Sequence, residues 1–137
     1  MFNFFKKKEK TAPKTEKEET TLNDDQKKQL NKEIERRNDE VNELSKSSSV
    51  NKDALATCYE KIGLAFFELG NMDEALANLE KSLDYKLTIG DGYKKLMSIY
   101  NKKRAEAAKN ADDEGIEKYM NKMDEMRQIA KKVTITG

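Results

Sequence analysis

The sequence predicts an all-α protein of about five helices, built of stacked helical hairpins and preceded by a disordered arm. Two amphipathic helical patterns meet across Gly70 and Asn71 in the segment from Tyr59 to Leu87, which predicts a helix-turn-helix hairpin. The chain has one proline in 137 residues and 39% charged residues, as expected of a soluble helical protein. Most apolar residues lie after Ala54, so the core is expected in the C-terminal part of the chain.

Residues 1–21 are expected to form a disordered arm that precedes a helical domain over residues 22–137. The arm contains the single proline, Pro13, in a mixture of Lys, Glu and Thr that has no apolar period. Its charges follow its apolar residues instead of preceding them, and it lacks the apolar core of about 7 residues that a secretory signal needs. We therefore expect no export.

Residues 22–46 are predicted to form a single capping helix with a narrow apolar seam. Asn23 is suited to cap its start, and Arg37 interrupts the seam. For the helix that follows, Asn51 or Asp53 is the expected cap. The seam consists of Leu30, Ile34, Val41 and Leu44.

Two hairpins are predicted to follow, over residues 53–87 and 91–132. The second hairpin should have longer helices than the first. A corner is expected near Arg104, but the segment NKKRAEAAKNADDEG continues the helical pattern there. The last helix is predicted to run from about residue 112 to residue 132.

The order of large and small residues in the first hairpin resembles a tetratricopeptide repeat that starts at Ala56. The pattern departs at Ser82, where the family prefers alanine, and at Leu87, where it prefers proline. The resemblance covers one clear repeat at about 56–89 and a divergent, elongated repeat at about 90–132. The positions that carry the first repeat are Tyr59, Ile62, Gly63, Phe66, Gly70, Ala75 and Leu79.

The resemblance implies a binding groove on the inner face of the first helix of each repeat. Because Glu60 and Leu64 stand where chaperone-binding members carry Lys and Asn, a carboxylate clamp is not implied. The channel would have an apolar floor between an acidic and a basic side, which suits a mixed-charge amphipathic peptide or helix. Alternatively, Leu64 and Phe67 are core residues that pack against the helix of the Leu30 to Leu44 seam. The implied groove residues are Thr57, Glu60, Leu64, Phe67 and Glu68 in the first repeat, and Asp91, Lys94, Ser98, Asn101 and Lys102 in the second.

An aromatic and basic segment at the N-terminus is typical of weak membrane contact. Aromatic rings favour the membrane interface, and each lysine near an anionic surface contributes about 1 kcal/mol. Such contact would be reversible. The alternatives are a solubilising terminus and an arm that docks on a protein. The segment consists of Phe2, Phe4, Phe5, Lys6, Lys7 and Lys8.

The residue types exclude the commonest catalytic and metal chemistries. The chain has no histidine and one cysteine, Cys58, which removes Ser/His and Cys/His nucleophile systems and the usual zinc ligand sets. The carboxylate pairs lie in charge-rich, solvated stretches, where their pKa values would not be tuned for catalysis. Cys58 is expected to be a small buried hydrophobe. We expect no enzymatic activity, no cofactor and no metal.

These observations predict a non-catalytic adaptor or scaffold that binds a peptide or helix of another protein. A net charge of +1 with interspersed signs gives no footprint for a nucleic acid. A single cysteine and the absence of a long apolar run favour the cytoplasm, with possible contact at the inner face of the membrane. The alternative function is a self-associating helical bundle, in which the Leu30 to Leu44 seam and the Met-rich last helix form a homodimer.

Overall fold

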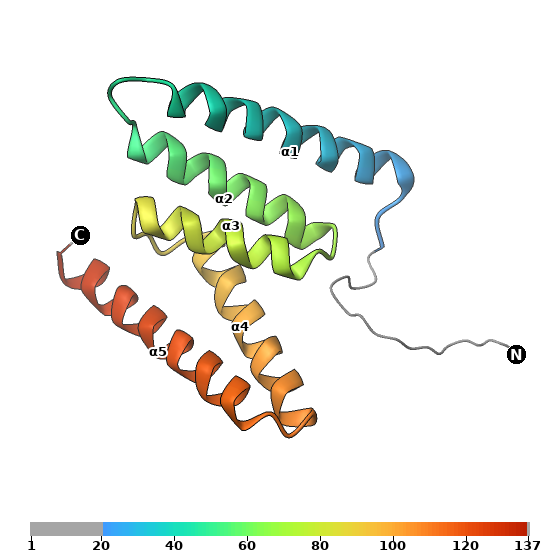
Figure 1. Ribbon diagram of the computed structural model, residues 1–137, viewed down its shortest axis with the longest axis vertical. Coiled ribbons are helices and arrows are strands. Elements are labelled where there is room, and N and C mark those ends of the chain that lie inside the picture. Colours follow the sequence, from blue (N-terminus) through green and yellow to red (C-terminus); the bar gives the residue numbers. More distant parts are fainter. Residues whose placement is uncertain (1–20, 137) are drawn as a thin grey trace, which may run out of the picture.

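The structure, a computed structural model, describes residues 21–136 and contains five α-helices and no strand within that range (Figure 1). The predicted all-α class and number of helices are confirmed. Residues 1–20, which form nearly all of the predicted arm, lie outside the described residues. The helices are α1 (Asp24–Ser45), α2 (Lys52–Glu68), α3 (Met72–Tyr85), α4 (Asp91–Lys109) and α5 (Asp113–Thr136).

The starts of α1 and α2 are capped by asparagine side chains, as the sequence predicts. Asn23 and Gln26 form a capping box: Asn23 Oδ1 accepts from the Gln26 N–H at 2.8 Å, and Gln26 Oε1 accepts from the Asn23 N–H at 2.9 Å. Asn51 caps α2, because its side chain accepts from the Ala54 N–H at 3.0 Å. Each cap satisfies backbone donors that the first helical turn leaves without a partner.

The α2–α3 corner depends on Gly70, which adopts a left-handed backbone conformation with φ of 83°. The N–H of Gly70 donates to the Phe67 carbonyl at 3.0 Å, and that of Asn71 donates to the Phe66 carbonyl at 2.9 Å. This is the Schellman arrangement, which ends a helix by satisfying its last carbonyls. It turns the chain sharply, so that α3 returns along α2.

The second hairpin is longer than the first, as predicted. Its helices have 19 and 24 residues, whereas α2 and α3 have 17 and 14. The predicted end of the last helix at residue 132 is wrong, because α5 continues to Thr136. The β-branched residues Val133–Thr136 are weaker helix formers, but the difference is only about 0.5 kcal/mol per residue, and no proline or glycine intervenes before Gly137.

Two apolar clusters form the core, and Phe66 of α2 packs against both. The first cluster joins α1 and α2, and it includes Cys58, which is 1% exposed and behaves as the predicted buried hydrophobe. The second cluster joins α3, α4 and α5. The buried residues of the first cluster are Ile34, Val41, Leu55, Cys58, Ile62 and Ala65. Those of the second are Met72, Ala75, Leu79, Leu83, Leu96, Ile99, Tyr100 and Met126.

The order of contacts places α2 at the centre of the molecule. It contacts α1, α3 and α4, whereas α1 contacts no other helix of the described range. α4 contacts α3 and lies antiparallel beside α5 (Figure 1). The described chain is therefore a stack in which the α2–α3 hairpin separates α1 from the α4–α5 hairpin.

Candidate functional site: the surface of α2 and α4

Three consecutive residues of α2 pack against three different parts of the molecule. Ile62 belongs to the cluster that α2 shares with α1. Gly63 allows close approach of α3, because a Cβ atom there would lie 2.7 Å from Leu79 Cδ2. Leu64 packs against the cluster built from α3, α4 and α5. The strip of α2 that contains Leu64 therefore lies along the seam with α4.

Leu64 and Phe67 are both half-buried at this seam. They pack against the cluster of α3, α4 and α5, not against the buried residues that α1 shares with α2. The alternative in which they pack against the helix of the Leu30 to Leu44 seam is thus not observed. Their half-exposure leaves apolar area accessible between the two helices.

Glu60, a predicted groove residue, binds the start of α4 instead of lining an open surface. Its Oε2 accepts from the Gly92 N–H at 2.9 Å. A carboxylate at a helix N-terminus satisfies an unpaired donor and interacts favourably with the helix dipole. Gly92 permits this contact, because a Cβ atom there would lie 2.7 Å from the same oxygen. Glu60 therefore links α2 to α4.

Lys95 lies beside the predicted groove residues and was missed by the repeat pattern. Its Nζ lies 4.8 Å from the centroid of the Phe67 ring, a cation–π distance. The pattern assigns the adjacent Lys94 to the groove, and both lysines are exposed. The basic character of the α4 side thus extends to the edge of the apolar seam.

The other predicted residues are exposed along the same two helices. Thr57 and Glu68 are exposed on α2, and Glu68 lines a shallow hollow together with Leu22 and Leu30. Of the predicted residues on α4, Asp91, Lys94, Ser98, Asn101 and Lys102 are all exposed, and Asn101 Oδ1 accepts from Arg104 Nη2 at 3.0 Å. We call the set Thr57, Leu64, Phe67, Glu68, Asp91, Lys94, Lys95, Ser98, Asn101 and Lys102 the α2–α4 surface.

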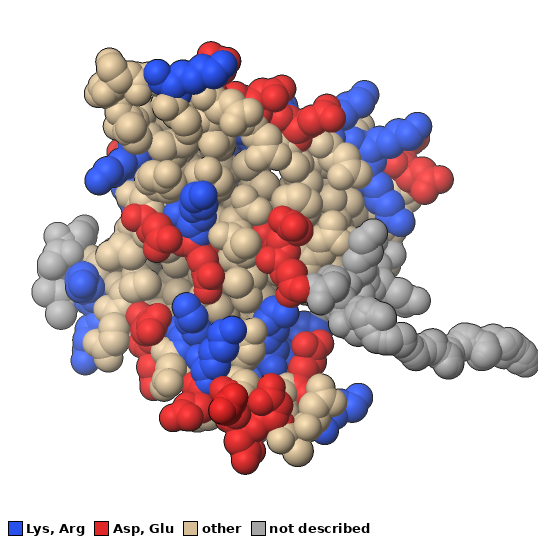
Figure 2. Space-filling view, in the orientation of Figure 1, with Lys and Arg blue, Asp and Glu red and all other residues tan. Residues whose placement is uncertain are grey.

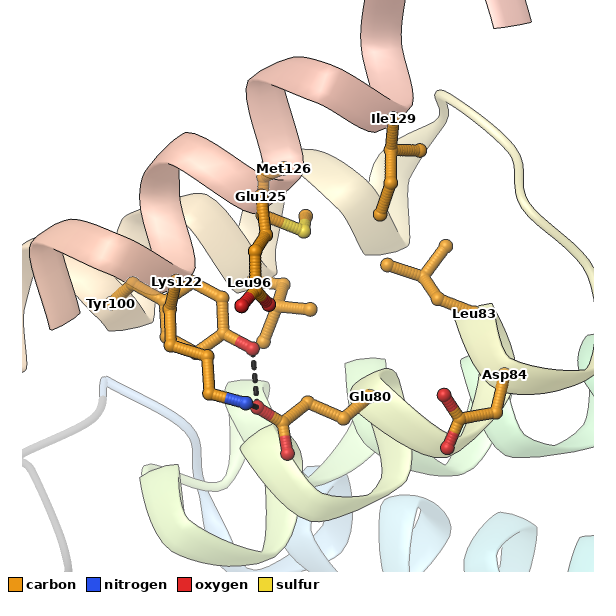
Figure 3. A pocket seen from close by; sticks show the side chains of 9 residues that line it. All are labelled: Glu80, Leu83, Asp84, Leu96, Tyr100, Lys122, Glu125, Met126 and Ile129. Atoms are coloured by element: carbon orange, nitrogen blue, oxygen red, sulfur yellow. Dashed lines mark hydrogen bonds and ion pairs between the residues drawn. The ribbon is translucent and has the colours of Figure 1, made fainter. Parts of the chain in front are cut away.

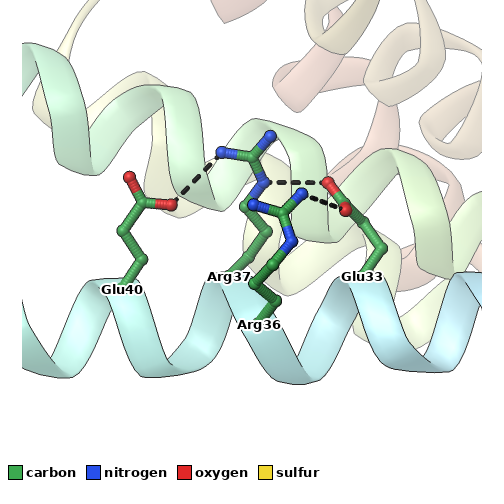
Figure 4. Close-up of polar contacts among 4 residues, drawn as sticks. All are labelled: Glu33, Arg36, Arg37 and Glu40. Atoms are coloured by element: carbon green, nitrogen blue, oxygen red, sulfur yellow. Dashed lines mark hydrogen bonds and ion pairs between the residues drawn. The ribbon is translucent and has the colours of Figure 1, made fainter.

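The clearest shifts of carboxylate and guanidinium pKa lie on α1, away from this surface (Figure 4). Arg37 Nε donates to Glu33 Oε2 at 2.8 Å, and its Nη1 donates to Glu40 Oε1 at 3.2 Å. The hydrogen bond from Arg37, followed by that from Arg36, lowers the pKa of Glu33. The same pairing raises the pKa of Arg37, which explains how a charged residue can interrupt the apolar seam of α1.

Burial is the largest cause of the two other pKa shifts in the described part of the chain. It raises the pKa of the Cys58 thiol, which opposes formation of a reactive thiolate. It also raises the pKa of Tyr100, whose hydroxyl donates to Glu80.

Over residues 21–136, no group of three or more His, Cys, Asp or Glu side chains is arranged to hold a metal ion. No helix in the described part of the chain is long and apolar enough to cross a membrane.

The predicted membrane-contacting segment, from Phe2 to Lys8, lies outside the described residues. Comparison with known proteins adds no assignment: no family model matches the chain, and no curated protein or solved structure matches it. The resemblance to tetratricopeptide repeats stays a prediction. The α2–α4 surface combines the residues that this resemblance implies with Lys95, and its geometry is that of an apolar seam with a lysine at its edge.

Proposed function

We propose that the protein is a non-catalytic adaptor that binds an amphipathic segment of a partner protein along the α2–α4 surface. The observation that carries the proposal is the pair of half-buried apolar residues, Leu64 and Phe67, at a seam where Lys95 lies over the Phe67 ring and the neighbouring Lys94 is exposed. Partly exposed apolar residues with a charged rim are typical of helix and peptide recognition. The tetratricopeptide resemblance, which implies most of these residues, is consistent with the same surface.

The charge of the surface favours an acidic ligand over the mixed-charge ligand expected from sequence. Glu60 is engaged with the Gly92 N–H, so the exposed carboxylates of the surface are Glu68 and Asp91, against the three exposed lysines Lys94, Lys95 and Lys102. Lys61, also exposed on α2, adds to the lysines of α4. A ligand with apolar residues at helical spacing and acidic residues between them would complement this surface. The proposed location is the cytoplasm, where the single cysteine would stay reduced.

Selection from a displayed peptide library, followed by titration of the selected peptides, tests the proposal. We expect acidic amphipathic peptides whose affinity falls about tenfold or more in the Lys94→Glu/Lys95→Glu variant, equivalent to about 1.4 kcal/mol. The matched control is Lys28→Glu/Lys32→Glu, which changes two exposed lysines of α1 by the same charge. If both variants weaken binding equally, or neither does, the ligand does not bind the α2–α4 surface.

Polar substitution of the apolar seam provides a second measurement. Leu64→Gln and Phe67→Gln should reduce peptide affinity while the helical circular dichroism spectrum is retained, because both residues are only half-buried. Loss of the spectrum in both variants would instead assign these side chains to the core, and the proposal would then depend on the lysine variants alone.

Self-association is the second candidate, and one observation favours it. Met120 of α5 is 52% exposed beside a hollow of about 250 Å³ that Met123 and Arg127 also line. The Leu30 to Leu44 seam has less apolar surface available for a dimer interface, because Ile34 and Val41 are buried against α2. A homodimer would therefore use α5 and the part of α4 that lines the same hollow. Light scattering after size-exclusion chromatography should then show a dimer in the wild type and a monomer in the Met120→Lys variant. A monomeric wild type would exclude self-association as the function.

A further inference from the structure

A further concave surface lies between α3 and α5 and shares no residue with the α2–α4 surface. It has a volume of about 200 Å³ and is lined by nine residues (Figure 3). We call it the α3–α5 hollow. Its apolar lining comes from three helices and consists of Leu83, Leu96, Met126 and Ile129. An apolar cavity of about 150 Å³ can hold a benzene ring, so this hollow is large enough for one phenyl side chain.

The rim of the hollow is acidic. Glu80 and Asp84 project from α3, and Glu125 projects from α5. Glu80 accepts a hydrogen bond from the Tyr100 hydroxyl and lies 3.7 Å from Lys122 Nζ. Asp84 and Glu125 are exposed, and neither has an ion-pair partner within the described range. Three carboxylates and one lysine leave the rim with a net charge of −2.

On the same face of the molecule, acidic and basic side chains are interspersed. Figure 2 shows Asp and Glu side chains over the middle of the face, where Figure 1 places α3, with Lys and Arg side chains among and below them. The acidic character is therefore local to the rim, whose carboxylates attract a basic segment and repel acidic peptides and anionic lipid headgroups. The occupant should therefore combine aromatic side chains for the hollow with positive charges for the rim.

We propose that the N-terminal segment of the same chain, residues 2–8, docks in the α3–α5 hollow. Its sequence, FNFFKKK, offers three phenyl rings and then three consecutive lysines. One ring fills the apolar hollow, and the lysines that follow pair with Asp84 and Glu125. The phenyl rings of the segment thus match the apolar centre of the hollow, and the lysines that follow them match its acidic rim.

The chain is long enough for this contact. Leu22 lines one hollow with Glu68, so the start of α1 lies near the α2–α3 corner. From Met72, Asp84 lies about 18 Å further along α3 at 1.5 Å per residue. Residues 9–21 can span about 43 Å when extended, and about 20 Å on average as a flexible linker. Tethering gives an effective concentration in the millimolar range, so even weak docking is populated within one molecule.

Paramagnetic relaxation in the full-length protein tests the proposal. A nitroxide on Asn3→Cys labels the arm selectively, because Cys58 is 1% exposed. We expect the methyl signals of Leu83, Met126 and Ile129 to lose at least half their intensity relative to the reduced label. Val41 and Leu55, in the other apolar cluster, serve as internal references that should keep theirs.

Charge reversal distinguishes docking from chance proximity. Asp84→Lys/Glu125→Lys should restore the intensity of the hollow methyl signals. Glu35→Lys/Asp39→Lys, which reverses two exposed carboxylates of α1, should leave the broadening unchanged. The proposal is overturned by absence of broadening, by broadening that survives the Asp84 and Glu125 reversal, or by broadening seen only between molecules when labelled and isotope-enriched proteins are mixed.

Discussion

Gly63 shows how a single small residue sets the distance between two helices. A Cβ atom at this position would lie 2.7 Å from both Cγ and Cδ2 of Leu79 and 3.2 Å from the Leu79 backbone nitrogen. Leu79 is 1% exposed, so its side chain has no free space into which to move. The absence of a side chain at Gly63 therefore determines the packing of α2 on α3.

Gly63→Ala should lower the free energy of unfolding by about 2 kcal/mol, because overpacking outweighs the gain in helix propensity. Chemical denaturation measures the change. In a Leu79→Ala background the same substitution should be neutral or stabilising, since the two side-chain atoms at 2.7 Å are gone and only the milder contact with the backbone nitrogen remains. Equal destabilisation in both backgrounds would show that the Leu79 contact is not the cause.

Tyr100 makes stability depend on alkaline pH. Burial, followed by its hydrogen bond to Glu80, raises the pKa of this 3% exposed side chain above that of an unfolded tyrosine, about 10. Above that pH the unfolded chain loses the proton while the native state keeps it, so stability falls as pH rises. Below about pH 10 the contribution is fully present.

Tyr100→Phe should therefore reduce the fall in unfolding free energy above pH 10 by up to about 1.4 kcal/mol per pH unit, the value for one proton. Denaturation midpoints at a series of alkaline pH values measure this slope. Cys58, whose pKa burial also raises, retains its own contribution in the variant. An unchanged slope would mean that Tyr100 is deprotonated equally in both states.

At the scale of elements, the two hairpin corners share one geometry but differ at its strained position. In the α4–α5 corner, the Ala111 N–H donates to the Ala108 carbonyl at 3.1 Å and the Asp112 N–H donates to the Ala107 carbonyl at 2.8 Å. This is the pattern seen around Gly70, but Ala111 adopts φ of 55° with a Cβ atom present. The left-handed conformation costs a non-glycine residue about 1–2 kcal/mol.

Ala111→Gly should raise the free energy of unfolding by about 1 kcal/mol by relieving this strain. The matched control is Ala105→Gly, in the exposed interior of α4, which should lower it by about 1 kcal/mol. Thermal or urea denaturation gives both values. Destabilisation by Ala111→Gly comparable to that of the control would argue against strain at this corner.

Sequence predicted these elements well where their determinants are local. Asn23 and Asn51 cap their helices with side chains that bond three residues ahead, and Gly70 ends α2 through its own backbone freedom. The end of α5 was predicted too early, because weak helix propensity near a terminus is a small effect. The corner at Ala111 has no glycine, so the sequence predicted only its approximate place, before a last helix that starts at about residue 112.

At the scale of the whole molecule, two surfaces of opposite net charge lie between the first and second hairpins. The α2–α4 surface carries the exposed Lys94 and Lys95, and the α3–α5 hollow is edged by Asp84 and Glu125. The first suits an acidic partner, and the second suits the basic arm of the same chain. Docking of the arm would also withhold its phenylalanines from other apolar surfaces, including membranes.

Vesicle binding should therefore be weak in the wild type and increase when the arm is released. We expect the Asp84→Lys/Glu125→Lys variant to co-sediment with anionic vesicles several-fold more than the wild type, since the lysines and aromatic rings of the arm are then available to lipid. Deletion of residues 1–10 in that variant should remove the gain. A gain that persists after the deletion would assign vesicle binding to the new lysines themselves.

The sequence by itself determined the helical class, the two hairpins, the capping residues and the exclusion of histidine-based chemistry, because these depend on residue types and on spacing within one turn or one helix. Only the tertiary structure decided that the Glu60 carboxylate accepts from the N–H of Gly92, 32 residues later in the chain, and so caps the start of α4. It also decided that Leu64 and Phe67 lie on the α4 seam, and that α3 and α5 border an open hollow with an acidic rim. The physical reason is that these contacts depend on the angle and distance between helices far apart in the chain, which single-helix periodicity does not encode.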